Sequence, residues 1–276
     1  MTHARVLVNG EPVDQVSAQD RGLAYGDGLF ESIRLISGSA PLWPRHMQRL
    51  CDSCARLFLP LPDPAQLWRE VQDVTRDLPQ SVVRITLTRG VGERGYAPPA
   101  SAQPTRVVAA FAPPPFVAQV YDEGLRLRVC DIRLADQPRL AGMKHLNRLE
   151  QVLACAEWSD PAIGEGLLCD SGGKVISAIM ANVFAVVDGV LLTPALDRCG
   201  VAGVARAEVL ASRPEAIIGE LTLEALRCAS EIFLTSSVRG IVPVKSLDDH
   251  GFSPGHTTRQ LQRHWRNLAF LMEQGG

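Results

Sequence analysis

The sequence contains very little lysine. Of its 28 basic residues only Lys144, Lys174 and Lys245 are lysines, and the rest are arginines. Acidic and basic residues nearly balance, at a formal net charge of -2, and are interleaved along the chain. Because there is no basic stripe, we do not expect nucleic acid or an anionic membrane as a partner. We expect a small molecule.

Long apolar runs are missing too. The longest charge-free apolar stretch, residues 177–187, is too short to cross a bilayer, and MTHARVLVNGEPV lacks the apolar core of a signal peptide. The seven cysteines are odd in number and scattered, which argues for reduced thiols. The six histidines form no cluster, so no metal site is expected. These absences predict a globular protein of the cytoplasm.

What is present is the pattern of a mixed α+β protein. Asn9-Gly10 and Asp188-Gly189 each lie between β-type runs and predict tight hairpins. Other segments show helical apolar spacing, helix caps or strand composition. Helices are expected over 45–58, 64–74 and 146–158, after Gly203, after Thr222 and from about Thr257 to Met272, and strands over 81–90, 105–111, 125–134 and 231–237.

The proline run APPPF at residues 112–116 cannot continue a β-ladder and predicts a boundary between two halves. We therefore expect a small N-terminal domain at residues 1–115, a linker at 116–122 and a larger domain at 123–276.

Lys144 differs from the other lysines in its setting. It follows the small pair Ala141-Gly142, which lets backbone and ligand approach closely, and precedes a predicted amphipathic helix. A partly desolvated amine at such an edge has a lowered pKa and can attack an aldehyde. The alternative is a solvated surface charge, which we expect for Lys174. The inward stripe of the helix would comprise Leu146, Leu149, Leu153 and Ala156.

A candidate anion site lies further along the chain. Gly200 and Gly203 come just before a predicted helix, whose first N–H groups lack internal partners and favour a phosphate. Ser236-Ser237 could complete the cup, and Arg49 could add charge. The alternative is that Gly203 only caps a helix and the serines only end a strand. A lysine with a phosphate cup, without a metal cluster or a GxGxxG motif, is what pyridoxal 5′-phosphate needs.

Seven segments carry a resemblance to a known family. The chain resembles the fold-type IV pyridoxal-phosphate enzymes, which include branched-chain and D-amino acid aminotransferases and 4-amino-4-deoxychorismate lyases. KHLNRLEQVLA and GERGY resemble the lyases in particular. The resemblance implies a small N-terminal and a larger C-terminal α/β domain with the cofactor in the crevice between them, in a homodimer. The segments are DRGLAYGDGLFESIRL, RHMQRL, TRGVGERGY, AGMKHLNRLEQVLA, NVF, CGVAGVAR and FLTSS.

The resemblance also implies roles for individual residues. Lys144 would hold the cofactor and move the substrate's proton, in a reaction that converts 4-amino-4-deoxychorismate to 4-aminobenzoate and pyruvate for folate synthesis. That substrate is a dicarboxylate, which an arginine fork suits. The implied cofactor contacts are Arg49, Ser177, Val204, Ala205, Ser236 and Ser237, and the implied substrate contacts are Arg94, Tyr96 and Phe30, with Arg89 and Arg34 as further candidates.

Two positions depart from the family pattern. Ser177 stands where the family has a glutamate that pairs with the pyridine nitrogen, and a hydroxyl cannot supply that negative charge. Ala205 stands where relatives often have a hydroxyl near the phosphate. One hypothesis is that a lyase tolerates the serine because forming an aromatic ring drives its reaction. The alternatives are a D-amino acid or branched-chain aminotransferase, which Glu31 favours, and a paralogue that binds a ligand without turnover.

Overall fold

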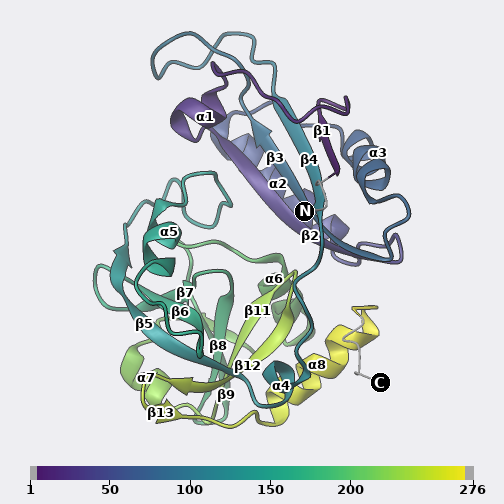
Figure 1. Ribbon diagram of the computed structural model, residues 1–276. Coiled ribbons are helices and arrows are strands. Elements are labelled where there is room, and N and C mark those ends of the chain that lie inside the picture. The colour runs from purple at the N-terminus through teal and green to yellow at the C-terminus, as the bar shows by residue number, and fades with distance from the viewer. Residues whose placement is uncertain (1–4, 271–276) are drawn as a thin grey trace. The chain divides into compact units, whose positions relative to one another are not determined.

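The computed structural model describes residues 5–270, which divide into two compact units (Figure 1). The first unit takes in the chain up to Pro114 together with Met143–Asn147. The second takes in Pro115–Gly142 and the chain from Arg148 onward. The chain thus leaves the first unit inside the proline run, and five residues around Lys144 return to it.

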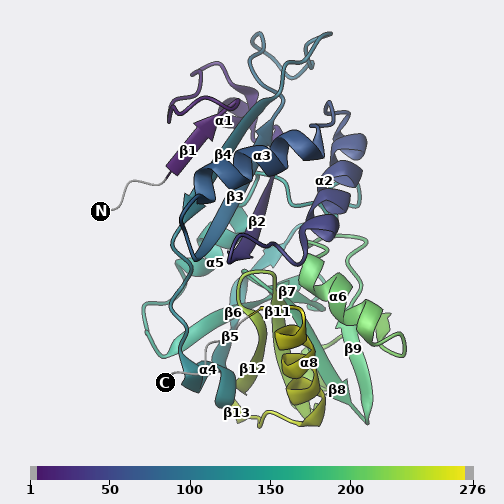
Figure 2. The same cartoon turned by 90° about the vertical axis from the view of Figure 1, so that its right-hand side faces the viewer.

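The first unit is a four-stranded antiparallel sheet in the order β1-β4-β3-β2. Helices α2 and α3 cover one face of this sheet (Figure 2). Asp63 caps α3 as predicted, because its carboxylate accepts from the Ala65 amide at 2.9 Å. The strands are β1 (Arg5–Val8), β2 (Gly28–Ile36), β3 (Gln80–Thr88) and β4 (Thr105–Phe111), and the helices are α1 (Arg21–Tyr25), α2 (Trp43–Leu57) and α3 (Pro64–Thr75).

Alternation along β2 and β3 assigns their side chains to the two faces of this sheet. Leu29 and Ile33 of β2 and Ile85 of β3 are buried in the core with α2 and α3. The register pairs Phe30 with Thr86 and Ser32 with Arg84. Because successive side chains point to opposite faces, these four residues lie on the face that α2 and α3 do not cover.

The second unit is built on a nine-stranded mixed sheet. Its strands follow the order β10-β9-β8-β11-β12-β5-β6-β7, and β13 pairs with β12. The Phe184 and Phe233 rings stack in its interior with their centroids 5.2 Å apart. The strands are β5 (Leu125–Leu134), β6 (Ile163–Asp170), β7 (Val175–Ala178), β8 (Asn182–Val187), β9 (Val190–Pro194), β10 (Ile217–Gly219), β11 (Glu231–Ser236), β12 (Gly240–Leu247) and β13 (His250–Gly251), and the helices are α4 (Ala118–Asp122), α5 (Leu149–Cys155), α6 (Val204–Ser212), α7 (Leu223–Arg227) and α8 (His256–Asn267).

Both predicted tight turns form, but one lacks its hairpin. Asp188-Gly189, with φ values of 50° and 78°, joins β8 to β9 as predicted. Asn9-Gly10 also turns tightly, since Val8 and Glu11 exchange main-chain hydrogen bonds of 2.9 and 3.0 Å. After Glu11, however, the chain forms no second strand of a hairpin within the described residues, and β1 pairs with β4 instead.

The helix predicted over 146–158 is shorter and faces differently. It begins at Leu149, because the Leu146 amide donates to the Gly28 carbonyl at 3.0 Å instead of entering a helix. The predicted inward stripe is wrong: Leu149 is 75% exposed and Leu153 58% exposed, whereas Ala154 is buried. The small Ala154 side chain lets this helix approach β5 and β6 closely.

Helix α8 begins at His256 and ends at Asn267. Its predicted end at Met272 lies outside the described residues. Within residues 5–270, none of the helices combines the length and the apolar character needed to cross a bilayer.

Candidate functional site

Lys144 lies in an extended segment that pairs with the start of β2. The Phe30 amide donates to the Lys144 carbonyl at 2.9 Å, and the Leu146 amide donates to the Gly28 carbonyl at 3.0 Å, which fixes the main chain from the lysine to Leu146. The Lys144 ammonium lies 4.3 Å from the centroid of the Phe30 ring, a cation–π contact. Lys144 is half-buried, whereas Lys174 is exposed and pairs with Glu220 at 2.7 Å.

The residues just before Lys144 are anchored to the loop that leads into α6. The Gly142 amide donates to the Gly200 carbonyl, and the Ala202 amide donates to the Gly142 carbonyl, both at 3.0 Å. Gly142 has a φ of +80°, which favours glycine. Because consecutive Cα atoms are about 3.8 Å apart, the Lys144 Cα is held within roughly 8 Å of the Gly142 Cα.

Asn182, the first residue of β8, positions the main chain just before the N-terminus of α6. Its side-chain amide donates to the Val201 carbonyl at 2.9 Å, and its oxygen accepts from the Gly203 amide at 3.0 Å. Gly203 is the N-cap residue and offers no side chain to the first turn. The amides of Val204 and Ala205 therefore begin the helix without a side-chain cap, the arrangement that suits an anion.

Strand β11 places a second polar feature beside this turn. Thr235 lies opposite Asn182 in the strand register, so both side chains lie on the same face. The Thr235 hydroxyl is buried and has no hydrogen-bond partner within the described residues. The Ser236 hydroxyl, in contrast, accepts from the Arg239 amide at 3.0 Å and closes the following turn. Ser236-Ser237 could be predicted from the end of the strand, whereas Thr235 could not, because only the register shows that it faces Asn182.

Arg49 is held by a buried carboxylate in the first unit. Its Nε donates to Glu31 at 2.8 Å, its Nη2 forms a second contact with that carboxylate, and His46 Nδ1 lies 2.7 Å from it. Burial alone would raise the pKa of Glu31, but the charge of Arg49 and the hydrogen bond from His46 lower it to about 2. Burial lowers the pKa of His46 despite the neighbouring carboxylate. No sequence motif marks this triad in advance, because its members come together only when α2 packs on β2.

Arg89 is committed to a structural clasp. Its Nε and Nη2 donate to Asp27 at 2.7 and 3.0 Å, and the guanidinium also donates to the carbonyls of Leu57 and Phe58 at 2.9 Å. Burial opposes ionisation of Asp27, yet hydrogen bonds from Arg89 and Arg21 lower its pKa. These four hydrogen bonds occupy the Arg89 guanidinium, so we assign Arg89 a structural role in place of the predicted substrate contact.

Arg94 and Tyr96 lie on an exposed loop of the first unit. Tyr96 is 86% exposed, and its ring centroid lies 5.4 Å from that of Tyr25. Arg21 steadies the loop by donating to three successive carbonyls, those of residues 95–97, at 2.9, 3.0 and 3.3 Å. Within residues 5–270, no hydrogen bond or ring contact joins Tyr96 to Phe30, so the placement of these two residues at the substrate stays a prediction.

Two further predicted residues have clear local settings. Arg34 lies on the same sheet face as Phe30 and donates to the Gln80 side chain at 2.7 Å. Ser177 is buried in β7, opposite Leu168 of β6. Asp170, close to it in sequence, holds the turn between these strands by accepting from the amides of Gly172 and Lys174 at 2.9 Å. Asp170 is thus a turn residue, as expected, and no replacement for the missing glutamate.

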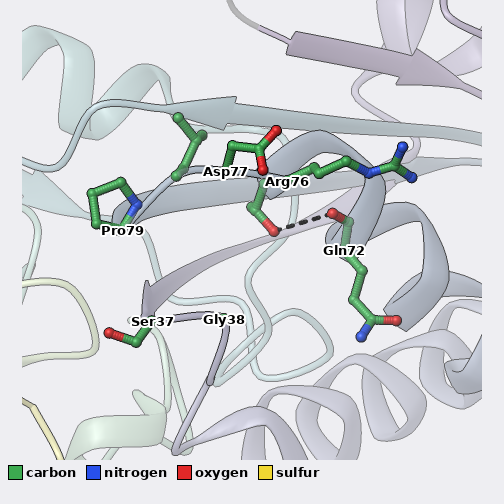
Figure 3. Close-up of a pocket in the computed structure, with 8 residues that line it drawn as sticks. Ser37, Gly38, Gln72, Arg76, Asp77 and Pro79 are labelled. Carbon is green, nitrogen blue, oxygen red and sulfur yellow. Dashed lines mark hydrogen bonds between the residues drawn. The ribbon is translucent and has the colours of Figure 1, made fainter.

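A surface hollow of about 520 Å³ lies elsewhere in the first unit, beyond the ends of β2 and α3 (Figure 3). Ser37, Gln72 and Arg76 are among its lining residues. None of the residues predicted for the site lines this hollow, and no lysine is among its lining residues.

The model of the family amino-transferase class IV matches residues 28–247, and the chain belongs to this family. It is 35% identical over 267 residues to an aminodeoxychorismate lyase from Vibrio harveyi, covering 92% of this chain and 97% of that one. It is 31% identical to a putative branched-chain-amino-acid aminotransferase from Methanocaldococcus jannaschii, covering 96% of each.

Among solved structures, 4-amino-4-deoxychorismate lyase from Pseudomonas aeruginosa superposes with a TM-score of 0.91 at 44% identity, covering 95% of this chain and 98% of that one. The two-domain α+β fold predicted from the resemblance is therefore confirmed.

The class IV aminotransferases and the aminodeoxychorismate lyases depend on pyridoxal 5′-phosphate, which confirms the predicted cofactor. The residues present fit this group. The N-terminus of α6, which begins at Gly203 without a side-chain cap, suits its phosphate, as does the Thr235 hydroxyl, which has no partner in the described residues. The half-buried amine of Lys144 suits its aldehyde. Val204 and Ala205 would hold the phosphate through main-chain amides, and Arg49 stays the predicted cationic contact.

Proposed function

We propose that this protein is a 4-amino-4-deoxychorismate lyase, which releases 4-aminobenzoate and pyruvate. The observation that carries the proposal is the setting of Lys144: its main chain is fixed by β2 and its ammonium rests on Phe30. The sequence around it, KHLNRLEQ, resembles the lyases, and the named lyases reach 35% and 44% identity over most of the chain.

Each proposed role follows from the local structure. When bound, the cofactor withdraws electrons from the substrate carbon that carries the amine. Lys144 removes the proton from that carbon, since a fixed amine close to the reacting atom is an efficient base. The C–O bond to the enolpyruvyl side chain then breaks as the ring becomes aromatic, and the proton goes to the departing enol, which becomes pyruvate. Phe30 limits the water around the amine. The amides of Val204 and Ala205, together with Thr235, keep the phosphate end in place.

An aminotransferase is the second candidate. The relative from Methanocaldococcus jannaschii is named as a putative branched-chain aminotransferase and is 31% identical. An aminotransferase must pass the amino group to a keto acid, whereas a lyase needs none. The two functions therefore differ in a requirement that one assay can test.

The test is pyruvate release from 4-amino-4-deoxychorismate by purified protein without any added keto acid. We expect stoichiometric pyruvate and 4-aminobenzoate over many turnovers. If the reaction stops after one turnover and resumes only when a keto acid is added, the protein is an aminotransferase and not a lyase. No turnover in either assay, with the cofactor bound, would identify a non-catalytic paralogue.

We also propose that the protein acts as a homodimer in the cytoplasm. Leu149, Val152 and Leu153 form an exposed apolar face on α5, being 75%, 60% and 58% exposed, which suits burial against a second copy. Seven unpaired cysteines suit a reducing compartment, which supports this location. Light scattering of the wild-type protein and of Leu153→Glu tests the dimer: we expect the mass to fall toward 29.9 kDa in the variant.

A further inference from the structure

Two cationic groups contact the ring of Phe30. The Lys144 ammonium and the Arg84 guanidinium each lie 4.3 Å from its centroid. The two charges are therefore separated by no more than twice that distance. Arg84 belongs to β3 and Lys144 to the segment that pairs with β2, so the ring connects two cations that are far apart in the sequence.

The position of Arg84 is fixed by the sheet. It lies directly opposite Ser32, and Phe30 lies directly opposite Thr86, so all four side chains lie on the face that α2 and α3 leave uncovered. The Arg84 Nε is within 3.4 Å of the Thr86 hydroxyl, which steers the guanidinium toward Phe30. Arg34 occupies the same face one diagonal step away.

Several arginines of this unit have an acidic partner, and Arg84 does not share this feature within the described residues. Arg21 and Arg89 pair with Asp27, Arg49 pairs with Glu31, and Arg106 pairs with Glu70. Arg84 forms no ion pair with any residue in the described part of the chain, and it is exposed. A rigid guanidinium on an aromatic ring, close to the reactive amine and without a carboxylate of its own, is suited to bind the carboxylate of a ligand.

We propose that Arg84 binds the ring carboxylate of the substrate, the one on the far side of the ring from the amine. This inference rests on the proposed lyase function. The substrate ring would lie along Phe30, with its amine toward Lys144 and its carboxylate toward Arg84. Arg84 would then select substrates whose amine and carboxylate lie at opposite ends of a six-membered ring.

The test compares two ligands that differ only in charge. Calorimetry would measure how the holoenzyme binds 4-aminobenzoate, and 4-aminobenzamide, which is neutral at the same position. The variants are Arg84→Gln, which removes the charge, and Arg84→Lys, which keeps the charge but loses the fork. Arg69→Gln on α3 is the matched control. The Arg69 side chain is 67% exposed, and its ion pair with Asp63 is long, at 3.9 Å, so losing it should cost little. Melting temperatures would confirm that each variant folds.

We expect Arg84→Gln to weaken 4-aminobenzoate binding by about tenfold to a hundredfold, the usual loss for a hydrogen-bonded charge, and to change 4-aminobenzamide binding less than about twofold. Arg84→Lys should fall between, and Arg69→Gln should match the wild type. Equal weakening of both ligands, or no weakening of either, would overturn the inference. Pyruvate release by the wild type tests the lyase function separately, because it does not depend on the ligand comparison.

Discussion

The side chain of Asn182 occupies the space that a Cβ atom on residue 203 would need. A methyl group built on Gly203 would lie 2.0 Å from the Asn182 side-chain oxygen, which already accepts from the Gly203 amide at 3.0 Å. The two residues are 21 positions apart in sequence, and their fit sets the direction of the first turn of α6.

Gly203→Ala should therefore damage the phosphate cup. The new methyl group must displace Asn182 or the first turn of α6, so we expect the cofactor to bind at least about tenfold more weakly, a cost of about 1.4 kcal/mol or more. Fluorescence titration of the apoenzyme with pyridoxal 5′-phosphate measures this. Gly251→Ala is the control, because its Cβ would meet nothing within 4 Å. Equal affinity in the two variants would mean that the cup lies elsewhere.

Lys144→Ala should lower the rate of pyruvate release by about a hundredfold to ten-thousandfold, the range for loss of a positioned base. Lys174→Ala should change little, since Lys174 is exposed and pairs with Glu220 on the surface. Borohydride reduction of the holoenzyme followed by peptide mapping gives an independent readout. A label on any lysine other than Lys144 would refute the site assignment.

Glu31→Gln should destabilise the protein in a way that depends on pH. The pKa of Glu31 is about 2 in the folded protein and close to its usual 4.5 in the unfolded chain, so the folded state binds fewer protons between these values. The stabilisation, about 3 kcal/mol, is complete above pH 4.5 and is lost as the pH falls toward 2.

Urea unfolding of the wild type and of Glu31→Gln at about pH 7, 5 and 3 checks this, because these values lie above and within the range between the two pKa values of Glu31. The difference in free energy of unfolding between the two proteins should narrow at pH 3. A constant difference would show that Glu31 acts through packing and not through its charge on Arg49.

Ser177→Glu should raise lyase turnover only slightly. Removing one well-placed electrostatic contact costs other enzymes about a hundredfold or more, but aromatisation of the product already drives this reaction. A glutamate in this buried strand must also shed its water. Steady-state pyruvate release compares the variant with the wild type, and Ser177→Ala serves as the matched control. A gain approaching a hundredfold would identify Ser177 as a defect rather than an accommodation.

Local patterns predicted much of the fold. The alternation over 125–134 gave β5 with its observed ends, and Asp63-Pro64 gave the start of α3, because caps and period-2 patterns act between near neighbours. The pairing of residues 144–146 with β2 could not be predicted in this way. It joins segments more than a hundred residues apart, and it overrode the helical pattern that begins at Leu146.

Candidate site residues could be predicted from the sequence only where the residue type and its local position indicate a chemical role. Lys144 and Gly203 stand out by rarity and by position before a helix. Arg84 does not, since it is one arginine among many and gains its meaning from the Phe30 ring across two strands. Thr235 likewise depends on the register that sets it opposite Asn182.

The return of Met143–Asn147 to the first unit has a consequence for biosynthesis. A ribosome completes β1 to β4 long before it reaches residue 143, so the nascent N-terminal sheet must wait with the edge of β2 unpaired. The segment that closes this edge carries Lys144, the amine that we propose as the reactive group. A truncated chain released before residue 144 would therefore lack the lysine and would leave the edge of β2 unpaired.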